Sequence, residues 1–159
     1  MPTSRILAIA LAGALAFGTT LPTVAVAQDS FENQLKARQG QFRLIALNIG
    51  VLGGMARGKI PYDAAAAQAA ADNLVAISSL NQGAMWPEGS DSMSIDGTRA
   101  MPSIWTDNAD FLEKWNAVAT GAAGIAAVAS NGQDAIGPAL GPLGGTCKAC
   151  HEAHRAPAS

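Results

Sequence analysis

The residues with the clearest chemistry are two cysteines and a histidine near the C-terminus. Cys147, Cys150 and His151 lie in the window Cys-Lys-Ala-Cys-His, which holds both cysteines of the chain and one of its two histidines. On a helix, Cys147 and His151 are one turn apart and Cys150 is adjacent on the same side. Two thiols can then form thioethers with haem vinyl groups while the imidazole binds iron. Cys-x-x-Cys-His is the attachment signature of c-type haem, so we expect one covalent haem c with His151 as the iron ligand.

Three other interpretations of this motif fit the sequence less well. A thioredoxin-like redox pair would lie near a βαβ pattern, and the sequence shows no period-2 alternation typical of strands. A disulfide between Cys147 and Cys150 would close a very short loop and stabilise the fold little. A zinc site would need four ligands, and this region offers at most the two cysteines, His151 and His154. Haem attachment is the interpretation we favour.

The sequence offers no clear second ligand for the haem iron. Because the motif ends eight residues before the C-terminus, a second ligand must come from upstream. Met55 lies thirteen residues after Phe42, which is roughly 20 Å along a helix, and the other upstream methionines of the mature chain are in a long loop. His154 leaves its helix on a different side from His151. We therefore expect Phe42, which has no lone pair to donate, to face the open side of the haem.

Arg38 is the next informative residue, because it occupies a core position of a predicted helix. An arginine is almost never fully buried unless it is paired, and no acidic residue lies three or four positions away. A haem propionate is a suitable partner for the planar guanidinium group. The alternative is that the side-chain stem packs while the charged head reaches water.

Four helical segments must position these residues. They are predicted at about 30–57, 61–80, 108–131 and 134–155, with Ser30 and Asn108 as caps, Pro61 at a first helical position and Asn131-Gly132 as a stop. Apolar residues recur at heptad spacing in the first and third segments. The fourth is expected to be kinked or interrupted by the prolines and glycines of residues 137–145. The 23 residues 83–105 form a loop long enough to cover a site. The fold class expected is all-α, an antiparallel up-down four-helix bundle.

The N-terminal 27 residues are predicted to be a secretory signal peptide. Arg5 precedes the apolar run of residues 6–17, and Ala25-Val26-Ala27 matches a small-x-small cleavage site. The remaining residues 28–159 form one domain of ordinary size. Removing Arg5 changes the net charge from −2 to −3, nine basic against twelve acidic residues, so nucleic acid is not an expected partner. No long apolar run remains to hold the mature chain in a membrane, and the expected location is the periplasm.

Beyond these features, the sequence resembles the cytochrome c′ family over nearly all of residues 28–155. The matching pieces are the pair Arg38-Gln39, the segments IPYDAA (60–65), WPEGS (86–90), MPSIW (101–105) and ADF (109–111), and the motif CKACH (147–151). Arg99 stands where an acid would be expected, and His154 replaces the usual aromatic residue of the attachment motif.

The resemblance implies a periplasmic, homodimeric bundle with a five-coordinate, high-spin haem that binds NO and CO. Phe42 matches the apolar residue that covers the distal face of the haem. Arg38, Gln39 and Thr98 match residues near the propionates. Arg155 matches a basic residue beside the proximal face, where NO can displace the histidine in the family.

Three functions follow from these features. The first is a gas-binding haem protein, a sink or carrier for NO, supported by the missing second ligand and by Phe42. The second is an ordinary one-electron carrier with a periplasmic electron donor. The third is a weak peroxidase or NO-converting enzyme, which would need a distal acid-base group. The first-helix stripe near Phe42 supplies no such group, so we do not expect an enzyme.

Overall fold

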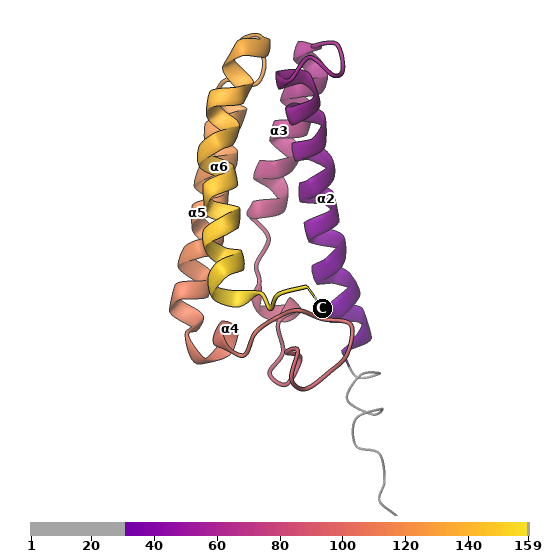
Figure 1. The fold of residues 1–159 in the computed structure, drawn as a ribbon, viewed down its shortest axis with the longest axis vertical. Coiled ribbons are helices and arrows are strands. Elements are labelled where there is room, and N and C mark those ends of the chain that lie inside the picture. Colours follow the sequence, from indigo (N-terminus) through magenta and orange to yellow (C-terminus); the bar gives the residue numbers. More distant parts are fainter. Residues whose placement is uncertain (1–30, 159) are drawn as a thin grey trace, which may run out of the picture.

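The computed structural model describes residues 31–158, and the predicted signal peptide lies outside this range. Four long helices dominate, namely α2 (Glu32–Ala56), α3 (Ala64–Ser78), α5 (Asn108–Ala126) and α6 (Gln133–His154). A 3-10 turn, η1 (Gly83–Met85), and a one-turn helix, α4 (Ser103–Thr106), lie between α3 and α5. The long helices run alternately up and down, with α2 against α3 and α6, and α5 against the same two (Figure 1). The expected all-α, antiparallel four-helix bundle is confirmed.

The apolar stripes predicted from heptad spacing form much of the core. The six apolar residues at heptad spacing in the third segment are all buried, namely Phe111, Trp115, Val118, Ala122, Ile125 and Ala129. The corresponding stripe of the first segment is only partly buried. Arg38, Ile45 and Leu52 are buried, whereas Phe42 is 38% exposed. The core is therefore well packed around α3 and α5 and more open beside α2.

Helix boundaries differ from the prediction where caps were assigned. Asp63 caps α3, since its side chain accepts a hydrogen bond from the Ala66 backbone N–H at 2.7 Å, and Pro61 lies outside the helix. Asn108 is the first residue of α5 rather than its cap, and its side chain donates to the Ile104 carbonyl at 3.0 Å. The proposed cap Ser30 lies outside the described residues, and α5 ends at Ala126, before Asn131-Gly132.

The expected interruption of the fourth helix is wrong. α6 is continuous through Pro138 and Pro142. The missing proline N–H groups weaken the backbone hydrogen bonding, but packing on the rest of the bundle holds the helix, since Ile136 and Leu143 are 0% and 1% exposed. Gly121 of α5 permits this packing, because a Cβ atom there would lie 3.1 Å from the backbone Cα of Leu143.

The segment between α3 and α5 folds beneath the open end of the bundle and pairs with the end of α6 (Figure 1). The Met101 N–H donates to the His154 carbonyl at 2.9 Å, and the Ala156 N–H donates to the Arg99 carbonyl at 2.8 Å. These bonds place the loop against the same end of α6 that contains the cysteine-histidine motif. No helix among residues 31–158 is long and apolar enough to cross a membrane.

Candidate functional site

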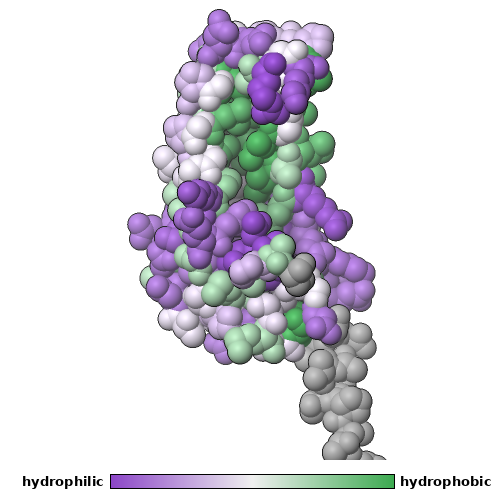
Figure 2. Space-filling model, viewed as in Figure 1, coloured by the Kyte–Doolittle hydropathy of each residue, from purple (hydrophilic) through white to green (hydrophobic). Residues whose placement is uncertain are grey.

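A cavity of about 820 Å³ lies between α2, α5, α6 and the loop. In the space-filling view it is a hollow with hydrophobic walls between α6 and α2 (Figure 2). Its volume is typical of sites that enclose a small-molecule ligand or cofactor. All eight predicted site residues line it, namely Cys147, Cys150, His151, Arg38, Gln39, Phe42, Thr98 and Arg155.

Cys147, Cys150 and His151 lie on the last two turns of α6, which brings all three to one wall of the cavity. Both thiols are free and half-buried. Burial raises the pKa of the Cys147 thiol, and burial is also the main cause of the raised pKa of Cys150. Neutral, uncharged thiols facing an apolar cavity suit thioether formation better than they suit a redox-active or metal-binding thiolate.

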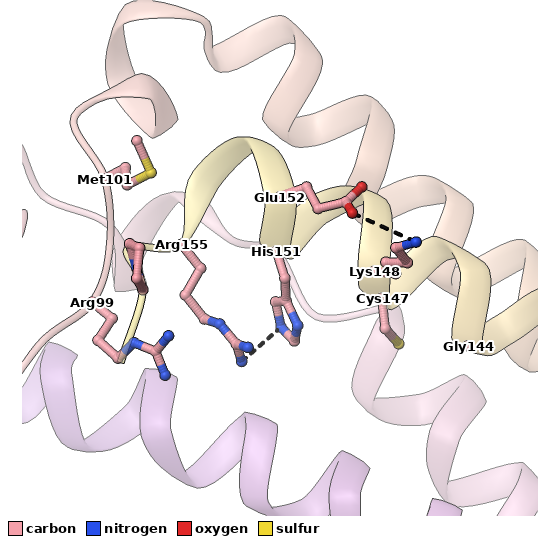
Figure 3. A pocket seen from close by; sticks show the side chains of 9 residues that line it. Arg99, Met101, Gly144, Cys147, Lys148, His151, Glu152 and Arg155 are labelled. Atoms are coloured by element: carbon pink, nitrogen blue, oxygen red, sulfur yellow. Dashed lines mark hydrogen bonds and ion pairs between the residues drawn. The ribbon is translucent and has the colours of Figure 1, made fainter. Parts of the chain in front are cut away.

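His151 faces the cavity with two arginines beside it. In Figure 3, the side chains of Cys147, His151 and Arg155 extend to one side of α6, and Arg99 approaches from the loop. The Arg155 Nη1 atom lies 3.4 Å from His151 Nε2. Burial, followed by the charges of Arg155 and Arg99, lowers the pKa of His151. A neutral imidazole is the form that binds a metal, so these surroundings favour iron ligation.

The wall opposite α6 is aromatic. Phe42 of α2 makes edge contacts with Trp86 of the loop and with Trp115 of α5, at ring-centroid distances of 6.5 and 6.2 Å. All three rings line the cavity. Phe42 therefore lies on α2, across the cavity from the helix that contains His151. The sequence assigned Trp115 only to the helical core stripe and gave no signal that it also borders the cavity.

Arg38 is buried, at 2% exposure. Its Nη1 atom donates to the Ser90 hydroxyl at 2.9 Å, its Nη2 atom donates to the Ser90 carbonyl at 3.1 Å, and its guanidinium lies 4.6 Å from the centre of the Trp86 ring. The alternative in which the charged head reaches water is thereby excluded. Trp86 and Ser90 belong to the WPEGS segment, and the sequence alone indicates no role for either residue. Because Arg38 also borders the cavity, it can contact an acidic ligand group there.

Gln39 and Thr98 occupy the loop side of the cavity. The Gln39 side chain donates to the Gly97 carbonyl at 2.9 Å, and the Thr98 hydroxyl accepts a bond from the Ala100 N–H at 3.2 Å. Gly97 has a positive φ of 77°, which turns the loop back toward α2. Both side chains therefore bind backbone groups of the loop and also line the cavity.

His154 occupies a site that the sequence did not predict. It is 4% exposed, it contacts α5 and α4, and it also borders the cavity. Its Nε2 atom is 3.0 Å from Asp110 Oδ2, and its Nδ1 atom is 2.9 Å from the Ser103 hydroxyl.

The residues on these walls fit a covalently attached haem. Two neutral thiols lie at the required spacing, an imidazole is at hand for iron, and the walls are apolar enough to enclose a flat macrocycle. Arginine side chains at the rim suit its carboxylates. The zinc alternative does not fit, because no three His, Cys, Asp or Glu side chains within residues 31–158 come together in a metal-binding group.

Comparisons with known proteins agree with this site. A family model described as Cytochrome C′ matches residues 33–155. Cytochrome c′ of Cereibacter sphaeroides is 39% identical over 85% of this chain and 90% of its own length. A solved cytochrome c′ from Rhodobacter Spheriodes superposes with a TM-score of 0.76 at 38% identity, covering 80% of this chain and 98% of that one.

Two solved variants of cytochrome c′ from Alcaligenes xylosoxidans, one a nitric oxide complex and one with carbon monoxide bound, superpose with TM-scores of 0.69 and 0.68. Each is 33% identical, and they cover 80% and 79% of this chain and 96% of their own. The haem expected from Cys147 and Cys150 is confirmed by this kinship, since the family binds haem c covalently through cysteines. The chain belongs to the cytochrome c′ family.

Proposed function

We propose that this protein is a periplasmic haem protein whose iron is five-coordinate and high-spin, and that it binds NO and CO. His151 is its iron ligand, and the opposite iron face is left to a diatomic gas. When bound, haem supplies an iron atom that can bind such a gas. Its biological role is that of an NO sink or carrier.

One observation supports this proposal above the others: the cavity wall facing α6 holds no second iron ligand. Met and Lys are missing from the described residues that line the cavity. The remaining imidazole, His154, is on the same helix as His151, and both its nitrogens are engaged by Ser103 and Asp110. Met55 is buried in the far part of the core and does not line the cavity. Phe42 offers only an apolar ring.

The other predicted residues have roles that follow from charge and position. Arg38, fixed by Ser90 and Trp86, presents a guanidinium at the cavity, where it can bind a haem carboxylate. Gln39 and Thr98 hold the loop over the same side. Arg155 places a positive charge beside His151, where it can stabilise the neutral form of that ring and polarise a ligand on the proximal side.

The gas ligands are supported by the relatives. Variants of the Alcaligenes protein are described as a nitric oxide complex and as carbon monoxide bound. Apolar, aromatic walls exclude water and charged ligands but admit small neutral molecules. The distal wall around Phe42 presents no acid-base side chain, so we propose binding rather than catalysis.

Electron exchange with a periplasmic donor is a second role that the site permits. The haem-bearing end of α6 borders an outer pocket with Arg99, Lys148 and Arg155 at its rim (Figure 3). A cofactor edge that reaches this exposed, basic rim is accessible to a redox partner. We rank this role second because the cavity lacks the second ligand that keeps iron coordination unchanged between oxidation states.

We also propose a homodimer formed through α2 and α3. Leu44 and Leu47 of α2 are 51% and 64% exposed. Asn73 of α3 donates to Asn48 of α2 at 3.1 Å, and Ala69 and Ala76, about one helical turn before and after Asn73, are exposed. Small residues let two helix pairs approach closely.

The test is the absorption spectrum of the purified holoprotein, oxidised and reduced, before and after addition of CO and NO. We expect high-spin spectra that change with both gases, and a ferrous form without a stable O₂ complex. A low-spin, six-coordinate spectrum that is indifferent to CO would contradict the proposal and make electron transfer the leading function.

A further inference from the structure

The proposed gas site assigns no role to the contact between His154, which is buried, and Asp110, which is one third exposed, although this contact lies at the end of the helix that positions His151. His154 is the last residue of α6. Its ring contacts Asp110 of α5 on one side and Ser103 of α4 on the other, and its edge-to-face neighbour is Phe111 at 5.7 Å between ring centroids. Three helices therefore meet at this single imidazole.

The hydrogen bonds around Ser103 indicate where its one proton goes. The Ser103 hydroxyl lies 2.9 Å from the Ala153 carbonyl, which can only accept. The residue four positions after Ala153 is Pro157, which has no N–H to continue the helical hydrogen bonding. Ser103 is thus the available donor for this carbonyl. If its proton points to Ala153, its oxygen must accept from His154 Nδ1–H.

The other ring nitrogen faces a carboxylate. Asp110 Oδ2 lies 3.0 Å from His154 Nε2, and Asp110 Oδ1 lies 2.8 Å from Lys114 Nζ. The bond to Lys114, with a smaller part from His154, lowers the pKa of Asp110. Since an ionised carboxylate only accepts, Nε2 must also bear a proton. Both ring nitrogens of His154 would then donate, one to Ser103 and one to Asp110.

We propose that Asp110, His154 and Ser103 form a charged clamp that fixes the end of α6 and so sets the orientation of His151. The clamp deepens the proposed function, on which it rests, by naming how the iron ligand is held. His154 is a positioning residue here, because it acts on His151 through the end of α6 that it holds. The backbone bond from Met101 to the His154 carbonyl and the bond from Ala156 to Arg99 tie the loop to the same point.

The first test is nitrogen-15 NMR of the histidine rings in the diamagnetic ferrous holoprotein near neutral pH. If the proposed function holds, CO makes the ferrous iron low-spin; if CO does not bind because the iron is six-coordinate and low-spin, the ferrous protein is diamagnetic without it. The His154 ring can be observed by NMR in both cases. A failure of the clamp can therefore be distinguished from a failure of the proposed gas-binding function. We expect two protonated nitrogens in His154. One protonated and one unprotonated nitrogen would overturn the clamp.

The second test uses Asp110→Asn, with Glu113→Gln as a matched control. Glu113 is an exposed acid on α5, so its substitution removes the same charge without touching His154. We expect the ring of Asp110→Asn to lose one of its two N–H signals near neutral pH, and the control to keep both. The charged groups near the ring are Asp110 and Lys114 of α5, Arg155 at the end of α6 and Arg99 of the loop, and all but Asp110 are unchanged in both variants.

The third test connects the clamp to the iron ligand. In Asp110→Asn, we expect the iron–histidine stretching frequency of the ferrous protein to shift, and in Glu113→Gln we expect it to stay unchanged. A frequency that stays at the unsubstituted value in Asp110→Asn, although the His154 ring has lost an N–H signal, would overturn the positioning role. Ser103→Ala, a smaller change that removes the acceptor for Nδ1–H, should give the same shift if Asp110→Asn does not fold.

Discussion

At the scale of single residues, Phe42 decides whether the iron keeps an open side. Its ring faces the cavity from α2, and it has no lone pair. We expect Phe42→Met to place a thioether opposite His151 and convert the high-spin spectrum to a low-spin one. If the five-coordinate form is then only about a tenth populated, the apparent affinity for CO should fall about tenfold. Absorption spectra and CO titration measure both effects.

Phe42→Leu is the control for this substitution. Leucine keeps the wall apolar and supplies no ligand, so the spectrum should stay high-spin and CO should still bind. If Phe42→Met also stayed high-spin, position 42 would be too far from the iron to provide a ligand, and the assignment of Phe42 to the distal face would be wrong.

Single residues also mark the limit of what the sequence could predict. Cys147, Cys150 and His151 were identifiable because their spacing is local and their chemistry specific. Arg38 was recognisable as a core arginine in need of a partner, but its partner Ser90 lies 52 positions away. The fold of the intervening loop selects that partner, and no local pattern encodes it. The contact of His154 with Asp110, 44 positions apart, depends on tertiary structure in the same way.

At the scale of elements, α6 shows why local signals for helix termination can fail. Its prolines and glycines predict a break, but the helix is stabilised by packing against its neighbours, as most helices in proteins are. The heptad stripes of the first and third segments predicted their faces well, because burial follows the same period. Cap residues were less informative, since a one- or two-residue shift of a helix end changes which side chain is the cap.

The close approach of α5 and α6 gives the element-scale prediction. Gly121→Ala would place a Cβ atom 3.1 Å from the Leu143 backbone, so the helices must separate. Overpacking of this kind costs about 1–3 kcal/mol, whereas an alanine in place of a helical glycine alone gains about 1 kcal/mol. We expect a net loss of unfolding free energy, measured by chemical denaturation of the holoprotein.

Gly124→Ala is the matched control on the same helix. A Cβ atom there meets nothing within 4 Å, so the variant should be more stable than the unsubstituted protein by up to about 1 kcal/mol. Equal stabilisation by both substitutions would mean that α5 and α6 can separate without cost.

At the scale of the whole molecule, the bundle is divided into a packed half and a cavity half. Buried apolar residues gather around α3 and α5, whereas α2 and α6 leave an apolar hollow between them (Figure 2). A cofactor that fills this hollow contributes apolar contacts that the side chains do not make. The sequence indicated the fold class and the attachment point, but the position of the cavity follows from how four helices and a loop pack together.

The exposed face of α2 and α3 gives the whole-molecule prediction. A stable interface buries about 1,600 Å² in total, and it would have to include Leu44, Leu47 and the neighbouring alanines of α3. We expect the holoprotein to be a dimer by sedimentation velocity and Leu47→Glu to be a monomer, because the substitution buries a charge on each side of a symmetric interface. Leu112→Glu on α5, where the leucine is 41% exposed, should stay dimeric.

Because Leu47 is 64% exposed, its substitution should change the stability of the monomer fold by no more than about 0.5 kcal/mol. Dissociation by Leu112→Glu and not by Leu47→Glu would place the interface on α5 instead.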